Sequence, residues 1–306
     1  MTTGRIPTGC IVVGIDAARA TDRAVDWAAD QAALEGRHLH LVHGTEPRLT
    51  WGSAAAVTVP SEAWGTAAEL ETTGHAILAR ATTRVVSRHP ELVVHQTLRT
   101  AEPGRLLVDL SIDAALVVVG SRGRGHVLRL ALGSVSEDVA ERAACPVVVL
   151  RPRHDDSPQQ DVLVAVDDTG GADDSATLVR FALRHAAVRR QSLTLLLTRS
   201  GEAATLPTAV ERAEGPGLSL EREVLVAALS AASEPGIVVP TTLLVSSGAP
   251  AECILALAAD MDLVVIGHHP RHGPGRLTHG SVAVDVLDNA PATIAVVPLA
   301  ESSCCK

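Results

Sequence analysis

The sequence predicts an α/β protein built from two consecutive domains, each a doubly wound parallel sheet. The chain has 306 residues, about twice the ~150 residues of an ordinary domain. Short uninterrupted runs of Val, Ile and Leu alternate with longer segments of 3.6-residue period, which is typical of parallel strands covered by crossover helices. This alternation occurs twice in the same order, and the sequence therefore predicts a duplicated domain.

Three pairs of segments carry the internal repeat. In each pair the second segment follows the first after about 150 residues. The pairs are CIVVGID (10–16) with DVLVAVDD (161–168), DAALVVVG (113–120) with DMDLVVIG (260–267), and ALGSVSEDVAERAACPVVVL (131–150) with THGSVAVDVLDNAPATIAVV (278–297). The order and spacing are kept throughout, which indicates duplication and not chance similarity.

The boundary between the two halves lies in RPRHDDSPQQ, residues 151–160, whose prolines and polar residues suit an exposed linker. We therefore expect one domain over residues 1–153 and a second over residues 159–306.

The elements of the first half follow in order from the sequence. After the first apolar run, Ala24, Ala28 and Ala32 fall on one face of a helix. Four further apolar runs predict strands near Leu39–His43, Leu92–Leu98, Leu116–Gly120 and Pro146–Leu150. Five strands joined by right-handed crossovers make a doubly wound domain.

Composition and charge argue against several classes of function. A net charge of −9 disfavours binding to nucleic acid or to anionic membranes, since both require Lys and Arg to neutralise phosphates. With no Tyr, one Phe and three Trp, the chain offers little surface on which bases could stack. No leader pattern and no apolar run of ~20 residues is found, so we expect a cytoplasmic protein without a membrane partner.

The five cysteines show no CxxC spacing. Cys10, Cys145 and Cys253 lie in apolar context, as buried thiols do, whereas Cys304 and Cys305 lie near the carboxyl end. We interpret all five as incidental, with a redox or metal role as the alternative.

A glycine-rich segment follows the fourth predicted strand of the first half. Gly120 ends that strand, and Gly133 with Ser134 opens the next helix. In open α/β sheets ligands bind beyond the carboxyl ends of the strands, where Asp16 also belongs.

Each residue type in this segment suits a phosphate. Glycine at 120 and 123 lets the backbone approach an anion, and the amides at a helix N-terminus favour negative charge. Ser134 and Ser136 add hydroxyl donors, and Arg122 and Arg124 can add charge. The alternative, a tight turn with a serine cap, leaves the spacing of the glycines unexplained. The segment therefore predicts a phosphate site.

The pattern G-x2-G-x9-G-[ST] at Gly120, Gly123, Gly133 and Ser134 resembles the ATP-binding signature of the universal stress proteins. Other parts of the chain are similar to that family as well: VVGID ending at Asp16, the A-x-P step at Ala101–Pro103, Asp113 before the fourth strand, and CPVVVL at 145–150. The resemblance covers both halves, so the chain is similar to the tandem-domain members of the family that are common in actinobacteria.

The resemblance implies a fold, a cofactor and a function. It implies parallel sheets of strand order 3-2-1-4-5, of the adenine nucleotide alpha hydrolase-like type, and a homodimer that pairs through the last, edge strand. It implies ATP with Mg²⁺, and a role in the stress or dormancy response, usually without an established reaction.

The resemblance also implies roles for individual residues. Asp16 would lie near the adenosine and a metal at the phosphates, Val42 would face the adenine through its backbone, and Gly120 would lie beside the ribose. The phosphates would be surrounded by Gly123, Gly133, Ser134, Val135 and Ser136.

The second half departs from this pattern in GHHPRHGPGRLTHGS, residues 267–281. Pro270 stands where the second glycine belongs, and proline has no amide hydrogen and a fixed φ. The other positions are kept, namely Asp167, Gly248, Pro250, Gly280 and Ser281. We expect this half to keep the fold. Its sequence leaves open whether it binds a nucleotide.

The same segment holds His268, His269, His272 and His279. We interpret them as solvated loop residues. The alternatives are a metal site, or protonated rings that contact an anion in place of the lost amide.

The function predicted is that of an ATP-binding, nucleotide-responsive regulator, and no catalytic residues can be assigned from spacing. Two alternatives stay open. One is a slow Mg²⁺-dependent ATP hydrolase that uses Asp16, and the other is a nucleotide-free scaffold that acts through partner binding.

Overall fold

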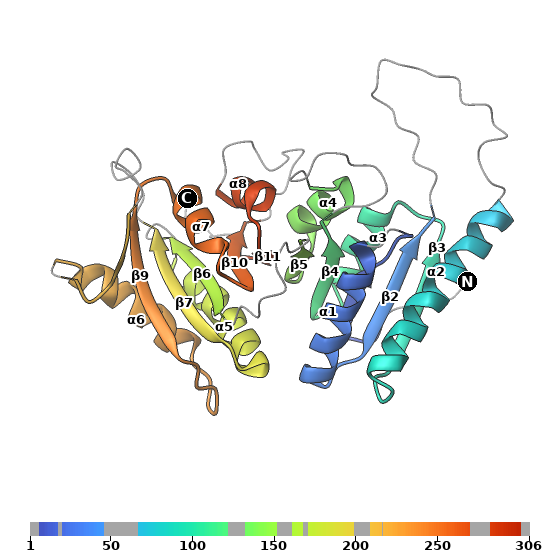
Figure 1. Ribbon diagram of the computed structural model, residues 1–306, viewed down its shortest axis with the longest axis horizontal. Helices are drawn as coiled ribbons and strands as arrows, with labels where there is room; N and C mark the ends of the chain where they lie inside the picture. The colour runs from blue at the N-terminus through green and yellow to red at the C-terminus, as the bar shows by residue number, and fades with distance from the viewer. Residues whose placement is uncertain are drawn as a thin grey trace, which may run out of the picture. The chain divides into compact units, whose positions relative to one another are not determined.

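A computed structural model describes most of the chain as two compact units (Figure 1). The described residues are 6–17, 20–45, 67–121, 132–151, 161–167, 171–198, 209–215, 217–269 and 282–300. The first unit contains the elements from β1 (Ile11–Gly14) to β4 (Leu116–Gly120) and the first part of α4 (Ser134–Arg142). The second contains β5 (Val147–Leu150) with every element from β6 (Asp161–Asp167) onward.

The first unit alternates strands and helices without exception among its described residues. Its elements are β1 (Ile11–Gly14), α1 (Ala20–Glu35), β2 (Leu39–Gly44), α2 (Ala67–Arg88), β3 (Val94–Arg99), α3 (Pro103–Ser111), β4 (Leu116–Gly120) and α4 (Ser134–Arg142). The strands are parallel in the order β3-β2-β1-β4, as predicted for these four. β4 has the bounds that its apolar run predicted.

The core of the first unit forms where β1 lies between its two neighbours. Ile11, Val12 and Val13 have no exposed surface, because helices cover both faces of a parallel sheet. Ala24, Ala28 and Ala32 of α1 are equally buried, which confirms the predicted helix face. Right-handed crossovers put α1 and α2 on one face of the sheet and α3 on the other (Figure 1).

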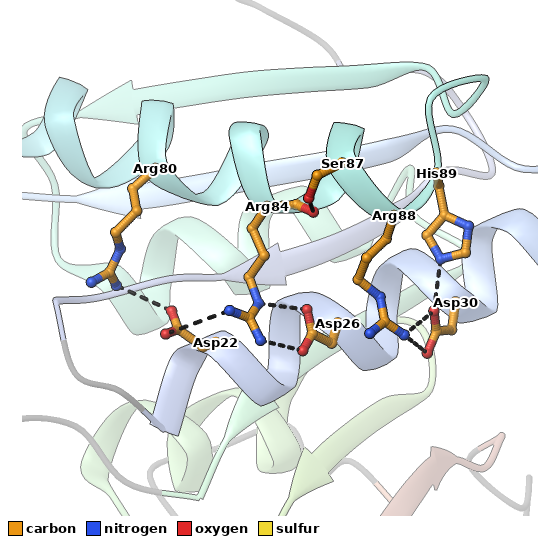
Figure 2. Close-up of polar contacts among 8 residues, drawn as sticks. All are labelled: Asp22, Asp26, Asp30, Arg80, Arg84, Ser87, Arg88 and His89. Carbon is orange, nitrogen blue, oxygen red and sulfur yellow. Dashed lines mark hydrogen bonds and ion pairs between the residues drawn. The ribbon is translucent and has the colours of Figure 1, made fainter.

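A row of ion pairs joins α1 to α2, and we call it the Asp/Arg ladder (Figure 2). Aspartates recur every four residues on α1, and arginines recur every four residues on α2, so each set occupies one helix face. The pairs are Asp22–Arg80 at 3.2 Å, Asp26–Arg84 at 2.5 Å and Asp30–Arg88 at 3.0 Å, with His89 also 2.7 Å from Asp30. Each Asp–Arg pair spans 58 residues of sequence, as parallel helices in constant register require.

The second unit repeats this succession and adds to it. Its elements are β6 (Asp161–Asp167), α5 (Ala172–Arg189), β7 (Ser192–Thr198), β8 (Ala209–Arg212), α6 (Ser219–Ala232), β9 (Thr241–Ser247), α7 (Pro250–Ala258), β10 (Leu263–His268), α8 (Val282–Asn289) and β11 (Thr293–Pro298). The parallel order β9-β7-β6-β10-β11 is the predicted order 3-2-1-4-5.

Two antiparallel strands flank this parallel sheet. At one side β5 (Val147–Leu150) pairs with β11, with Val148 opposite Ala295. At the other side the unpredicted strand β8 pairs with β9. Each added strand satisfies backbone groups that an edge strand would otherwise leave unpaired.

No described helix is long and apolar enough to cross a membrane.

Candidate functional site

Two hydrogen bonds close the base of the glycine-rich segment in the first unit. The Gly133 amide donates to the Ser121 carbonyl at 2.9 Å, and the Ser136 hydroxyl donates to the Gly120 carbonyl at 2.6 Å. The two ends of the segment therefore meet beyond the carboxyl end of β4. Gly123 and the two arginines at 122 and 124 lie outside the described residues.

The start of α4 presents backbone amides without a side-chain cap. Gly133 is the N-cap, with extended φ −74° and ψ 145°, and no side chain caps the helix. The first helical hydrogen bond runs from Glu137 N to Gly133 O at 2.9 Å, so the amides of Ser134, Val135 and Ser136 precede the helical bonding pattern. Such amides and the helix dipole favour an anion at this position.

The two serines of α4 differ in exposure. The Ser134 side chain is exposed at the helix start, where its hydroxyl can reach a ligand. Ser136 is buried, and its hydroxyl proton is directed to Gly120. Ser136 therefore holds the loop base, and only its backbone amide is left to contact an anion.

Asp16 lies at the same edge of the sheet, just beyond β1. Val13 pairs with Val118 of β4, and Asp16 and Ser121 each follow three residues after that pair. The Asp16 carboxylate accepts a hydrogen bond from the Thr21 hydroxyl in the first turn of α1. This contact ties the carboxylate to the first turn of α1.

Val42 is buried within β2, and its carbonyl accepts a hydrogen bond from the Ile15 amide at 2.9 Å. β2 continues past it to Gly44. His43 follows, with its Nδ1 donating to the Ile15 carbonyl at 2.7 Å. His43 thus lies at the strand end beside Asp16, and sequence reasoning missed it, although its place directly after the LHLV run was a usable signal.

The A-x-P step packs against the end of β2. A Cβ at Gly44 would lie 2.9 Å from the Ala101 carbonyl oxygen, so only glycine permits this approach. Glu102 caps α3, accepting from Gly104 N at 3.0 Å and Arg105 N at 2.6 Å. The A-x-P step therefore packs closely against the carboxyl end of β2, at the edge of the sheet where the candidate site lies.

Other residues singled out in the sequence lie away from this edge. The Asp113 carbonyl accepts from Gly9 N at 2.7 Å, at the amino end of the sheet. Burial raises the pKa of the Cys10 thiol to about 11 and that of Cys145 to about 12, as expected for unreactive buried thiols. Cys253 is buried too, and the two cysteines at 304 and 305 lie outside the described residues.

The second unit contains a cavity of about 380 Å³ at the carboxyl ends of β6, β7 and β10. Asp167, Asp174 and His269 are the ionisable groups in its described lining. The His269 ring faces two acceptors, Asp174 at 3.6 Å from Nε2 and the Ala300 carbonyl at 3.2 Å from Nδ1. His269 is therefore not simply solvated, which refines the sequence interpretation of this ring.

His268 is described as well, with its Nε2 3.0 Å from the Glu141 carbonyl, whereas residues 270–281, with Pro270, His272, His279, Gly280 and Ser281, lie outside the described residues. Within the part of the chain that is described, no group of three or more His, Cys, Asp or Glu side chains is placed to hold a metal ion.

Comparison with known proteins agrees with this geometry. The sequence model of the "Universal stress protein family" matches residues 9–151 and again residues 159–298. A universal stress protein of Mycobacterium tuberculosis is 32% identical over 301 residues, covering 94% of this chain and 96% of the relative. A second protein of that species is 32% identical over 311 residues, covering 97% and 98%.

A solved structure shows the same fold. It is a universal stress protein from Archaeoglobus fulgidus, with a TM-score of 0.67 at 17% identity, and it covers 96% of this chain and 99% of its own. Two matches of one family model and relatives that span nearly the full chain confirm the resemblance seen in the motifs. The chain belongs to the universal stress protein family.

Proposed function

We propose that the first unit binds ATP at the carboxyl edge of its sheet and that the protein acts as a nucleotide-responsive regulator in the stress or dormancy response. The observation that carries this proposal is the pair of hydrogen bonds that closes the glycine-rich segment beside the uncapped start of α4. Family membership supports it, because the motif in this segment is the one that resembles an ATP signature.

The described residues offer a suitable environment for each part of the nucleotide. The amides of Ser134, Val135 and Ser136 with the exposed Ser134 hydroxyl suit the phosphates. Gly120, which has no side chain, leaves room for a ribose beside the strand end. The backbone around Val42 and His43 would then face the adenine.

A Mg²⁺ ion fits the donor set at this edge. Mg²⁺ is commonly held by one or two carboxylates together with phosphate oxygens and water, and Asp16 supplies a carboxylate that α1 fixes in place. When bound, the ion would neutralise phosphate charge. Asp16 would hold it, and the α4 amides would orient the phosphates.

Isothermal titration with MgATP tests the proposal, with Ser136→Ala as the main variant. Loss of the hydroxyl leaves the Gly120 carbonyl without its 2.6 Å donor and loosens the loop base. Removing one such partner costs about 1–3 kcal/mol. We expect ATP affinity to fall roughly tenfold, which corresponds to about 1.4 kcal/mol.

Ser111→Ala is the matched control. Ser111 is also buried, and its hydroxyl oxygen accepts from Ala144 N at 2.8 Å, so the variant loses a comparable contact away from the site. Its ATP affinity should equal that of the wild type. Equal affinities for all three proteins would reject this site, and absence of ATP binding by the wild type would reject the function. ADP formation in the same samples would reveal slow hydrolysis, which Asp16→Ala should abolish.

A homodimer belongs to the same proposal. β5 and β11, the edge strands expected to be covered either within the chain or between chains, pair with each other within one chain. Strand pairing between chains would therefore use another edge, such as β3 in the first unit or β8 in the second. Light scattering on the full chain, with and without ATP, measures whether a dimer forms.

A further inference from the structure

Three histidines gather at the amino ends of β2 and β3, opposite the edge that carries Asp16. His38 directly precedes β2, His40 lies within it, and His95 pairs with His40 across the two strands. Alternate residues of a strand point to one face, so all three rings lie on the same face of the sheet. The ring centroids of His38 and His95 are 5.2 Å apart, and those of His40 and His95 are 5.9 Å apart.

His95 Nε2 and His38 Nδ1 lie 3.2 Å apart. Two nitrogens at this distance can share a proton, with one ring donating and the other accepting. The same distance suits two ligands of one tetrahedral metal ion, because bonds of 2.0–2.1 Å at the tetrahedral angle place the nitrogens about 3.3 Å apart. The separation of the two nitrogens is therefore already that of two ligands of one ion, and binding would require the rings to turn so that both lone pairs point at it.

Both ligand candidates can be reached from solvent. The His38 side chain is exposed and that of His95 is half-buried. The net charge of −9 favours a cation over an anion at such a position.

The third ring, His40, holds His95 in place and is not itself placed as a ligand. It stacks on His95 with an interplanar angle of 19°, and its Nε2 is 2.8 Å from the Thr97 hydroxyl. His40 is itself buried, so the pair is supported on its inner side by a ring held within the sheet.

We propose that His38 Nδ1 and His95 Nε2 bind one divalent ion of the late first-row transition metals, of which Zn²⁺ and Cu²⁺ are the best matched, with water as the remaining ligands. Imidazole nitrogen suits these ions, whereas Mg²⁺ prefers oxygen. On binding, the proton shared by the two nitrogens moves to the other nitrogen of the donor ring, and each facing lone pair then meets the metal. The site is independent of nucleotide binding, since it lies at the opposite end of the strands.

A site-resolved assay is needed because the chain has 13 histidines. The full-length protein is treated with diethyl pyrocarbonate at increasing ZnCl2, and carbethoxylation of each histidine is mapped by mass spectrometry. The free lone pair of a neutral ring attacks a carbonyl carbon of the reagent, and a ring with metal on one nitrogen and hydrogen on the other has no free lone pair. His75 of α2, whose side chain is 64% exposed, is the control on the same domain.

We expect Zn²⁺ to protect His38 and His95 together, at one midpoint concentration, and to leave His75 reactive. MgCl2 should protect neither. His38→Ala should raise the Zn²⁺ concentration that half-protects His95 at least about tenfold, and His95→Gln should do the same for His38, since each removes one of two protein ligands.

Two results would overturn the proposal. One is equal carbethoxylation of His38 and His95 with and without Zn²⁺ in the folded wild type. The other is protection of His95 that persists unchanged in His38→Ala, which would mean that the metal binds elsewhere. Because His38 is exposed, this variant should keep the wild-type melting temperature, and that measurement separates lost binding from lost folding.

Discussion

The Asp/Arg ladder between α1 and α2 can be tested by a double-mutant cycle at its central pair (Figure 2). Asp26→Asn and Arg84→Met, made singly and together, remove the charge while keeping most of each side chain's volume. The cycle isolates the interaction energy of the pair from the effects of each substitution alone.

The structure sets the expected magnitude. Arg84 donates two hydrogen bonds to Asp26, both at 2.5 Å, and it also lies 4.0 Å from Asp22. The two side chains of the central pair are 42% and 21% exposed, so solvent screens the attraction. Exposed pairs contribute about 0.2–1 kcal/mol, and bidentate geometry within a network favours the upper end, so we expect about 1 kcal/mol.

The pair Asp22–Arg80 serves as the internal comparison. It is joined at 3.2 Å by one contact, and its side chains are 32% and 54% exposed. We expect a coupling energy of about 0.3 kcal/mol there.

Urea unfolding followed by tryptophan fluorescence measures both cycles. All three tryptophans, Trp27, Trp51 and Trp64, lie in the first half of the chain, so the signal reports this half. Salt near 1 M shortens the screening length to about 3 Å and should reduce both coupling energies. Equal coupling at the two pairs, or a central coupling that is unaffected by salt, would refute the reasoning.

Three further predictions follow from single positions. Gly44→Ala places a methyl 2.9 Å from the Ala101 carbonyl oxygen and should lower the free energy of unfolding by about 1–3 kcal/mol. Urea titration measures this, and an unchanged free energy of unfolding would mean that the backbone shifts at no cost. Burial, and next the charge of a nearby arginine, lowers the pKa of His185 from 6.5 to about 3, so stability is full above pH 6.5 and falls as pH drops toward 3. In His185→Leu the free energy of unfolding should fall less steeply between pH 7 and 5, by up to about 1.4 kcal/mol per pH unit. A pH dependence of unfolding equal to that of the wild type would exclude this ring as the cause. Iodoacetamide should label Cys10 and Cys145 only after unfolding, as mapped by mass spectrometry, and rapid labelling of the folded protein would contradict the raised pKa of both thiols.

Much of the fold follows from the sequence because its strands are continuous apolar runs. Both ends of the strand Leu116–Gly120 were predicted correctly, because a strand covered on both faces is an unbroken apolar run that stops where the strand stops. β8 could not be found, because the sequence AVER has no such run and becomes a strand only by pairing with β9. The Asp/Arg ladder could not be predicted either, because it depends on contacts between distant segments: the sheet determines which residues of α1 lie beside which residues of α2.

The candidate site, too, could be predicted from the sequence only in part. The motif named Gly120 and Gly133, Ser136 was predicted beside them, and the structure brings these three residues together. Spacing could not tell that the Ser136 hydroxyl turns inward to Gly120, or that His43 reaches the Ile15 carbonyl, because both depend on distances across the fold. Binding of ATP at this site stays a prediction.

The pairing of β5 with β11 has a consequence for any fragment of the chain. A cut in residues 151–160, where the sequence places its linker, would leave the second half without β5. β11 would then lose the partner that lies opposite Ile294, Ala295 and Val296, and all three of these residues are buried in the intact chain. An apolar strand freed in this way is a template for self-association. Proteolysis at the linker would therefore yield a carboxyl-terminal piece prone to aggregate, whereas a piece that begins before Pro146 would carry its own protecting strand.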